Sequence, residues 1–455
     1  MPNLQPYVDP ISVKIDSTLD NASVAANRGD CMDKRVFRNL PPSVSGKHVN
    51  TIPRVNSSII TRLLLAFLLS EVTTGIPFNS DAASLPGLST ARDGTLLRNG
   101  VPYRGVGVNY PDAFLRPLRH PEDQSYRDDF RALAANHIPF ARITACGFWP
   151  SDYKSYLQDK ENYFKVLDGV VQAAEESNVG LIANLFWASS TVPDLVGEPR
   201  DQWGNSQSKT RQFMRTYIRE VVSRYVNSPA IWGWEFSNEC NLSLDNPDAW
   251  RNQRSINPRL GMTRSRGPDD TVTTEIFTSA LSDFARTVRE IDDHRMLLTG
   301  NSVPRFSAYH MQTERRNGAD NAEQFATMLL RQNPGPFNPI CIHTAPMSPM
   351  PRFAKRPVSY NELIQTCARA ARSASKSLYI EEFVTCAPKM ECSIATRRGY
   401  VNEVLGAMQA NNVSLASVWV YGRKMIHDPS SLSFDDETAS VLQMIGDFNR
   451  KWSPR

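Results

Sequence analysis

Residues 179–186 (VGLIANLF) and 230–237 (AIWGWEFS) are two short apolar runs, and the intervening residues 209–226 form an amphipathic stretch. Runs that are apolar almost throughout are typical of parallel strands buried on both faces of a sheet. A strand, a helix and a second strand in this order predict parallel strands that are joined by a helical crossover.

The same unit recurs from about residue 95 to the end of the chain. The expected strands are 103–110, 140–147, 179–186, 230–237, 295–302, 339–344, 377–383 and 414–421. The expected helices are 126–137, 161–178, 209–226, 271–293, 322–332, 358–376, 394–411 and 438–450. Eight of each predict an α/β fold, a (β/α)8 TIM barrel that forms one domain over residues 90–455. The rival, a doubly wound open sheet, usually carries a phosphate-binding glycine loop, and no GxGxxG or GxxxxGK[ST] is present.

The first part of the chain has a different character. Residues 1–56 lack a sustained period and are rich in Asn, Ser, Asp and Pro, which predicts a disordered extension. Within residues 57–83, Arg62 precedes the apolar run Leu63 to Leu69, and small residues follow at 80–83. That layout is typical of a secretory signal and too short to span a bilayer. A signal normally begins near the N-terminus, whereas this segment lies far from Met1. Either the true start codon lies further downstream, or the segment is a core helix or an uncleaved anchor.

Charge and cysteine content narrow the classes of function. The formal net charge is only +4, and no basic block stands out after residue 62, so nucleic acid is not an expected partner. The seven cysteines include no CxxC pair and no zinc spacing, so we expect no metal and no organic cofactor. Cys386 and Cys392 bracket a short loop and can form a disulfide in an exported protein. We expect a monomer that is secreted or in the cell envelope, without a stable membrane partner.

Two carboxylates stand where this fold places its active site, at the C-terminal ends of the strands. The fourth strand runs into Asn238-Glu239, and the seventh ends in Glu381-Glu382-Phe383. Cleavage of a glycosidic bond needs one carboxylic acid to protonate the leaving oxygen and one carboxylate to attack the anomeric carbon or to activate water. Glutamates on two opposite strands of one barrel predict this chemistry.

The sequences around these glutamates resemble glycoside hydrolase family 5, a member of the large clan of barrel glycosidases. Ile231-Trp232-Gly233-Trp234-Glu235 leading into Asn238-Glu239 resembles the fourth-strand motif, and Leu378 to Phe383 resembles the seventh-strand motif. The resemblance implies that Glu239 is the general acid/base, that Asn238 binds the sugar 2-hydroxyl and that Glu382 is the nucleophile. Strand alternation separates Glu381 from Glu382, because neighbours point to opposite faces. Glu381 remains the alternative nucleophile.

The resemblance implies roles for further substrate-binding residues. Arg142 matches an arginine that ionises the nucleophile, His343 a histidine near the reacting sugar, and Trp419 a platform for a pyranose ring. Asn109, at the end of the first strand, is a weaker match. The chain departs from the family pattern at three places: Cys240 stands where many members have Pro, Phe186-Trp187 where many have His, and Thr344-Ala345-Pro346 where many have Tyr.

The expected function is a retaining glycoside hydrolase that cleaves β-linked polysaccharide or oligosaccharide of the β-mannan or β-glucan type. Glu239 should have a raised pKa, and Glu382 should stay ionised beside Arg142. The alternatives are a non-catalytic carbohydrate-binding barrel and an exo-acting β-glycosidase. A metal-assisted hydrolase would need His and Asp at several strand ends, where only His343 qualifies. Four tryptophans near the strand ends could contact sugar: Trp149, Trp187, Trp203 and Trp234.

Overall fold

The structure is a computed structural model. It describes residues 86–253, 256–345, 353–354, 356–386, 392–422 and 428–452. The predictions of a disordered extension at 1–56 and of a signal-like segment at 57–83 lie outside these residues. Among the described residues, no helix is both long enough and apolar enough to cross a membrane.

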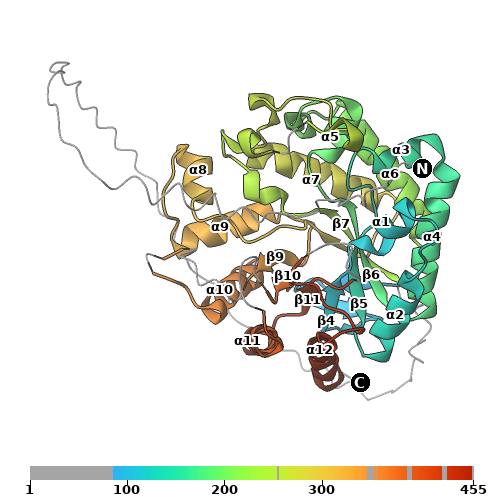
Figure 1. Cartoon of the computed structure of the whole chain (residues 1–455). Coiled ribbons are helices and arrows are strands. Elements are labelled where there is room, and N and C mark those ends of the chain that lie inside the picture. The colour runs from blue at the N-terminus through green and yellow to red at the C-terminus, as the bar shows by residue number, and fades with distance from the viewer. Residues whose placement is uncertain are drawn as a thin grey trace, which may run out of the picture. The chain divides into compact units, whose positions relative to one another are not determined.

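Eight parallel strands form the centre of the fold, and each overlaps an expected strand (Figure 1). They are β4 (Gly105–Asn109), β5 (Phe140–Thr144), β6 (Gly180–Phe186), β7 (Ile231–Ser237), β8 (Met296–Leu298), β9 (Ile340–Thr344), β10 (Leu378–Val384) and β11 (Leu415–Trp419). The hydrogen-bonded order is β8-β7-β6-β5-β4-β11-β10-β9, so the first and the last of these strands pair with each other. The predicted (β/α)8 barrel is therefore confirmed, as a barrel that is nearly closed.

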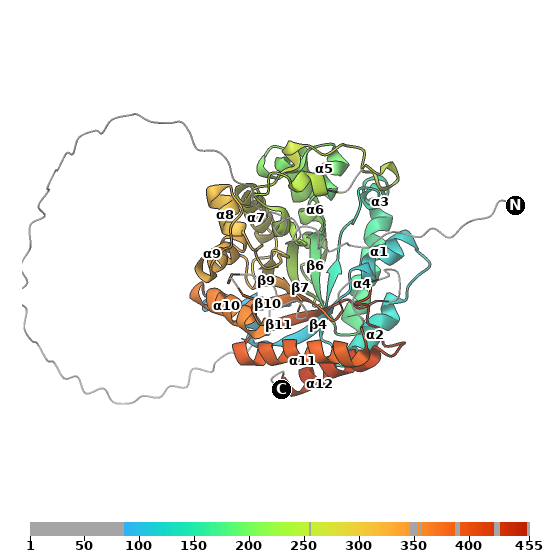
Figure 2. The ribbon, with the colours of Figure 1, turned by 60° about the vertical axis from the view of Figure 1, so that its left-hand side comes forward.

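Helices surround the strands, and every expected helix is present (Figure 1). They are α2 (Tyr126–Ala135), α4 (Lys160–Glu176), α6 (Lys209–Tyr225), α7 (Thr274–Arg289), α9 (Ala322–Gln332), α10 (Tyr360–Ser373), α11 (Ile394–Asn411) and α12 (Ala439–Trp452). Six of these helices begin at a side chain that accepts a backbone N–H of the first turn, which satisfies one otherwise unpaired donor. These N-caps are Asp159, Ser208, Thr273, Asn321, Ser359 and Ser393. Figure 2 shows α11 and α12 side by side along one flank of the barrel.

Shorter helices occupy the connections and were not predicted. They are α1 (Asp112–Arg119), α3 (Asp152–Gln158), α5 (Thr191–Val196) and α8 (Ala308–Glu314), together with the 3-10 helices η3 (Arg200–Gly204), η4 (Cys240–Ser243), η5 (Ala249–Asn252), η6 (Pro258–Leu260) and η7 (Pro268–Asp270). All of these short helices follow the C-terminal end of a barrel strand. The two long inserts at 187–208 and 240–270 hold most of them.

The N-terminal end of the barrel is closed by apolar packing. A small antiparallel sheet precedes the barrel and consists of β1 (Leu88–Thr90), β2 (Leu96–Arg98) and β3 (Val101–Pro102). Leu88 and Leu96 of this sheet are fully buried and join an inner cluster of residues from the strands. The strand residues of this cluster are Phe140, Ile182, Trp232, Met296, Leu298, Cys341, Tyr379 and Leu415. Because strand side chains alternate, the next inward positions lie one layer closer to the C-terminal ends.

The Cys386–Cys392 disulfide is formed and closes the loop that follows β10, with the two Cα atoms 5.6 Å apart. The four other cysteines within the described residues are buried thiols: Cys146, Cys240, Cys341 and Cys367.

Gly300 follows β8 and holds the backbone of the fourth strand's end in place. Its carbonyl accepts the Glu239 N–H at 2.7 Å, its φ is +72°, and a Cβ built on it would overlap the carbonyl oxygen of Ser237. A side chain here would meet both the strain of a left-handed conformation and a backbone clash.

We expect Gly300→Ala to lower the free energy of unfolding by roughly 2–4 kcal/mol, because the clash with Ser237 is with backbone that has no other position to take. Urea denaturation measures this. The matched control is Gly399→Ala at an open, exposed position of α11, where a Cβ meets no atom within 4 Å. This control should be neutral or stabilising by about 0.5–1 kcal/mol. Equal effects of the two substitutions would contradict the account.

Candidate active site

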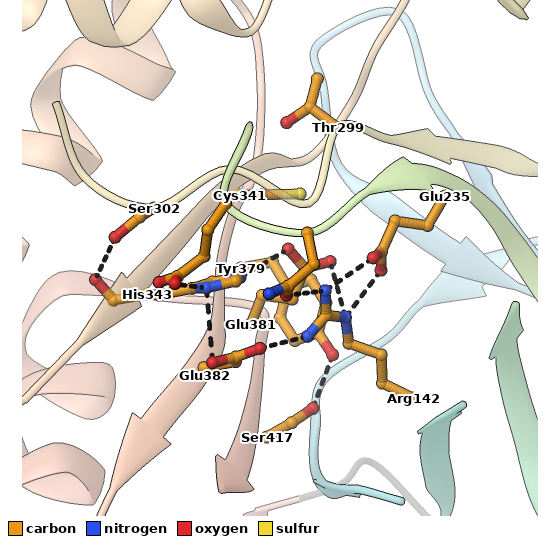
Figure 3. A network of polar contacts seen from close by, with 12 residues as sticks. Arg142, Glu235, Thr299, Ser302, Cys341, His343, Tyr379, Glu381, Glu382 and Ser417 are labelled. Atoms are coloured by element: carbon orange, nitrogen blue, oxygen red, sulfur yellow. Dashed lines mark hydrogen bonds and ion pairs between the residues drawn. The ribbon is translucent and has the colours of Figure 1, made fainter. Parts of the chain in front are cut away.

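The guanidinium of Arg142, on β5, lies at the centre of the polar residues at the C-terminal end of the barrel (Figure 3). It donates two parallel hydrogen bonds to Glu235, from Nε at 2.8 Å and from Nη2 at 2.7 Å. Nη1 donates to Glu382 Oε1 at 2.5 Å and to Asn109 Oδ1 at 3.0 Å, and Nη2 also donates to Asn238 Oδ1 at 2.8 Å. Arg142 thus joins residues of β4, β7 and β10 around one fully buried cation.

Glu381 and Glu382 are neighbours on β10, yet both carboxylates belong to this network. Glu382 contacts Arg142 Nη1, and Glu381 Oε1 lies 3.7 Å from Arg142 Nε. The prediction that alternation would separate them to opposite faces is therefore wrong. The reason is a register shift between Ile380 and Glu382 in the pairing with β9, and a second between Ile380 and Phe383 in the pairing with β11. This bulge turns a second side chain toward the barrel mouth.

Asn109 stabilises the bulge. Its Nδ2 donates to the backbone carbonyl of Glu381 at 3.0 Å, while its Oδ1 accepts from Arg142. Asn109 is fully buried, and both the nitrogen and the oxygen of its side-chain amide are hydrogen-bonded within the protein. The structure brings this residue into the network as a support for Glu381 and Arg142.

Glu239 stands two residues beyond β7 in a left-handed conformation, with φ at +52°. The N–H of Asn238 donates to the carbonyl of Trp187 at 2.9 Å, and the N–H of Glu239 donates to that of Gly300. These two bonds fix the chain where it leaves the strand. The Glu239 side chain is the most exposed of the site's carboxylates at 29%, against 11% for Glu382 and 0% for Glu381.

His343, on β9, lies between the carboxylates. Its Nδ1 is 3.0 Å from Glu239 Oε1 and 3.4 Å from Glu382 Oε2, and its Nε2 is 3.2 Å from Glu381 Oε2. One ligating atom from each of Glu239, His343 and Glu382 lies within 4.8 Å of the other two. The structure therefore brings together Glu239, Glu382, Asn238, Arg142, His343 and Asn109 as one constellation.

The pKa values follow from burial and from these partners. Burial alone would lower the pKa of His343, but the carboxylates of Glu382, Glu239 and Glu381 outweigh it and raise the pKa to about 10. Burial raises the pKa of Glu235 to about 8 against the opposing charge of Arg142. Both shifts place an additional proton inside the network at neutral pH.

Glu239 and Glu382 shift in opposite directions. Burial acts to raise the pKa of Glu239, but the hydrogen bond and charge of His343, together with Arg142, lower it overall. Burial raises the pKa of Glu382 despite His343 and Arg142. The prediction of a raised pKa for Glu239 is therefore wrong in this structure, whereas the ionised state of Glu382 at neutral pH stays a prediction. The reason is that His343 Nδ1 lies closer to Glu239 than to Glu382.

Of the tryptophans that could contact sugar, the structure places two at the site. The rings of Trp187 and Trp419 lie 6.1 Å apart at an interplanar angle of 31°, and Trp187 covers the Arg142 guanidinium at 4.8 Å. Trp419 is half-buried, and its Nε1 donates to Asp428 at 2.8 Å. Both rings therefore flank the acidic residues.

Trp203 and Trp234 are buried core residues, so for them the sugar-contact prediction is wrong. Trp203 Nε1 donates to the carbonyl of Ser189, and Trp234 Nε1 donates to Asp292. Trp149 is also buried and packs edge-on against Phe148.

Glu235 and Asn184 also belong to the site, although neither was among the residues predicted for it. Glu235 sits inside the fourth-strand motif but received no role, and Asn184 Nδ2 donates to Glu235 Oε1. The sequence contains a feature that could have indicated each of them. Asn184 lies two positions after the inward-facing Ile182, and a Glu within an otherwise apolar buried strand needs a charged partner.

Two groups of three acidic and histidine side chains among the described residues lie close enough together to hold a metal ion. They are Glu239, His343 and Glu382, and Asp292, Asp293 and His294. The first group coincides with the constellation above. In the second, Asp292 already accepts from Arg295 and Trp234. The expectation of a site without metal remains a prediction.

Comparison with known proteins adds to this geometry. No family model matches the chain. The chain is 32% identical over 122 residues to a mannan endo-1,4-beta-mannosidase A of Podospora anserina, which covers 24% of this chain and 31% of that protein. The match thus spans about a third of that relative's length.

Two solved structures cover most of the chain. The endo-1,4-beta-mannanase of Rhizomucor miehei has a TM-score of 0.57 at 17% identity, covering 80% of this chain and 99% of that chain. A glycoside hydrolase family 5 mannosidase of the same organism has a TM-score of 0.52 at 14% identity, covering 81% and 99%. The chain therefore has the fold of these barrels, and the predicted resemblance to family 5 is confirmed as a resemblance in part of the sequence and in the fold.

Proposed function

We propose that this protein is a retaining glycoside hydrolase that cleaves β-1,4-linked mannan. The observation that carries the proposal is that one carboxylate oxygen of Glu239 lies within 4.8 Å of one of Glu382 at the C-terminal end of a (β/α)8 barrel. Retaining glycosidases hold their two carboxyl groups about 5–5.5 Å apart, whereas inverting enzymes leave roughly 6.5–9.5 Å for a water molecule. The short distance favours attack by a carboxylate over attack by water.

In the proposed first step, a carboxylate oxygen of Glu382 forms a bond to the anomeric carbon, and the bond from that carbon to the leaving oxygen breaks. Glu239 gives its proton to the leaving oxygen. In the second step, water attacks the same carbon and returns a proton to Glu239, while the ester bond to Glu382 breaks. Arg142, 2.5 Å from Glu382 Oε1, stabilises the carboxylate when it leaves.

The proposed roles of the other residues follow from their positions. Asn238 is held by Arg142 beside the acid/base and is suited to bind the sugar 2-hydroxyl, a contact that strengthens in the transition state. Trp419 is half-buried next to the buried Trp187 and is suited to offer an aromatic face to the apolar side of a pyranose ring.

The choice of mannan rests on similarity. The Podospora anserina relative and one solved structure described above carry names of mannan-cleaving enzymes, and the other solved structure is named a mannosidase. A β-glucan is the alternative polymer of the same class. A non-catalytic binder would have no need of the four buried or half-buried glutamates around Arg142 and His343, whose desolvation costs stability.

We also propose that the protein is exported. The Cys386–Cys392 disulfide supports an oxidising compartment, because such bonds persist mainly outside the reducing cytosol.

The test of the function is the release of reducing ends from β-mannan, glucomannan, cellulose derivatives, xylan and laminarin. We expect release from the mannans, and Glu382→Gln or Glu239→Gln should lower kcat by on the order of a thousandfold or more. Glu220→Gln is the matched control, because Glu220 bonds Tyr156 and Lys160 away from the site. Release from a glucan alone would revise the substrate. If no polymer is cleaved, or if Glu382→Gln keeps full activity, the proposed function is wrong.

The pH dependence of kcat/KM should be bell-shaped, with its limbs on either side of pH 4.5. Glu239 and Glu382 titrate as a pair, and the active form carries one proton between them. Since the pKa of Glu239 is lowered from 4.5, the acidic limb, where both groups become protonated and activity is lost, should lie below pH 4.5. Since the pKa of Glu382 lies above 4.5, activity is lost again when the pair gives up its last proton. Initial rates between pH 3 and 9 measure this, and an acidic limb well above 4.5 would contradict it.

A further inference from the structure

Glu381 is a buried carboxylate that the two-step reaction does not use. Its side chain has no exposed surface, and its two oxygens face different cations. Oε2 lies 3.2 Å from His343 Nε2, and Oε1 lies 3.7 Å from Arg142 Nε. The backbone carbonyl of the same residue is bonded to Asn109. Glu381 is therefore held at both its backbone and its side chain.

His343 meets a carboxylate at each of its ring nitrogens. Nε2 faces Glu381, and Nδ1 faces Glu239 at 3.0 Å. A neutral imidazole has only one N–H, so one of its nitrogens would present a lone pair to an ionised carboxylate. Only the doubly protonated ring can donate to both partners. The geometry around His343 therefore requires two protons on the ring whenever Glu381 and Glu239 are ionised.

The charges near His343 come from three strands. Three carboxylates contact its ring, the Arg142 guanidinium contacts two of these, and a fourth carboxylate bonds Arg142; no described lysine takes part. These groups are Glu239, Glu381, Glu382, Glu235 and Arg142. Arg142 bonds Glu235 and Glu382 at 2.5–2.8 Å and lies 3.7 Å from Glu381. Burial acts to raise the pKa of Glu381, but Arg142 and the hydrogen bond and charge of His343 lower it overall. The closest cation to Glu381 is His343.

We propose that Glu381 is a positioning residue that holds His343 doubly protonated and aims its Nδ1–H at Glu239. The proton affinity of the acid/base is then set by a buried carboxylate that touches no substrate. The catalytic consequence rests on the proposed function, whereas the protonation of His343 does not depend on it.

Removal of this charge alone has a defined effect. In Glu381→Gln the side-chain amide keeps the shape of the carboxylate, and its oxygen still accepts one N–H from Nε2. Without the negative charge, the second ring proton is held less tightly, and Nδ1 faces Glu239 as a lone pair. Glu239 then takes up the proton or turns away from the ring.

The test is a titration of the histidine side chains by two-dimensional ¹⁵N NMR on the full chain. The His343 signal is assigned by its loss in His343→Asn. In the wild type, His343 should keep both ring protons at pH 8, and in Glu381→Gln its pKa should fall by roughly one unit or more. Glu220→Gln, whose carboxylate bonds Tyr156 and Lys160 instead, should leave the His343 signal unchanged. An unchanged His343 pKa in Glu381→Gln would overturn the proposal.

The wild-type spectrum alone decides the question if Glu381→Gln does not fold. A His343 ring that is neutral at pH 8 in the wild type would contradict the proposal without any variant. Thermal unfolding of Glu381→Gln and of Glu381→Asp shows whether loss of the charge or loss of the fold is being measured.

Kinetics give a second readout. We expect Glu381→Gln to move the acidic limb of the kcat/KM profile on mannan to higher pH, because Glu239 loses the cation that lowers its pKa, and Glu381→Asp to reverse part of this shift. An acidic limb that does not move in Glu381→Gln would count against the positioning role. If the wild type cleaves no polymer, the proposed function fails, while the NMR result still decides the state of His343.

Discussion

The structure of this site depends on one buried cation. Arg142 has no exposed surface and holds Glu235, Glu382, Asn109 and Asn238 at hydrogen-bonding distance. Removing one partner from a buried ion pair typically costs about 3–5 kcal/mol, because the charge that remains has no compensation. The loss of any one charged member should therefore destabilise the whole network. Its members on β4, β5, β7 and β10 fix the relative positions of those strands.

The layers of the barrel explain how so many charges fit inside it. The inward residues at the N-terminal end, such as Phe140, Ile182 and Tyr379, form an apolar layer. Two positions further along the strands stand Arg142, Asn184 and Glu381, which form a polar layer beneath the mouth. Glu239 and Glu382 lie above this layer, where they are partly exposed. The two carboxylates at the mouth, those of Glu239 and Glu382, thus lie over a polar layer whose side chains are fully buried.

Much of this could be predicted from the sequence, because apolar strands and amphipathic helices alternate so regularly. Arg142 and Glu239 could be predicted as well, since each belongs to a recognisable motif, within β5 for Arg142 and just after β7 for Glu239. The bulge on β10 could not, because a shift of register leaves no mark in the pattern of apolar residues. Without the bulge, alternation lets only one of Glu381 and Glu382 face the site. The directions in which the pKa values of Glu239 and Glu382 shift could not be predicted either. They depend on the distances from His343 Nδ1 to the two carboxylates, which are 3.0 Å and 3.4 Å.

The most direct test of the account is to trap the covalent intermediate. A 2-deoxy-2-fluoro mannosyl fluoride should react with the protein, because the fluorine at C2 slows both steps while the good leaving group at C1 keeps the first step fast enough for the intermediate to accumulate. Mass spectrometry of the digested protein should then find one added sugar on Glu382, within the segment Leu378–Val384. A sugar on Glu381 would show that the bulge presents the other neighbour as the nucleophile. Hydrolysis of mannan without any covalent adduct, and with inversion at the anomeric carbon, would contradict the two-step mechanism.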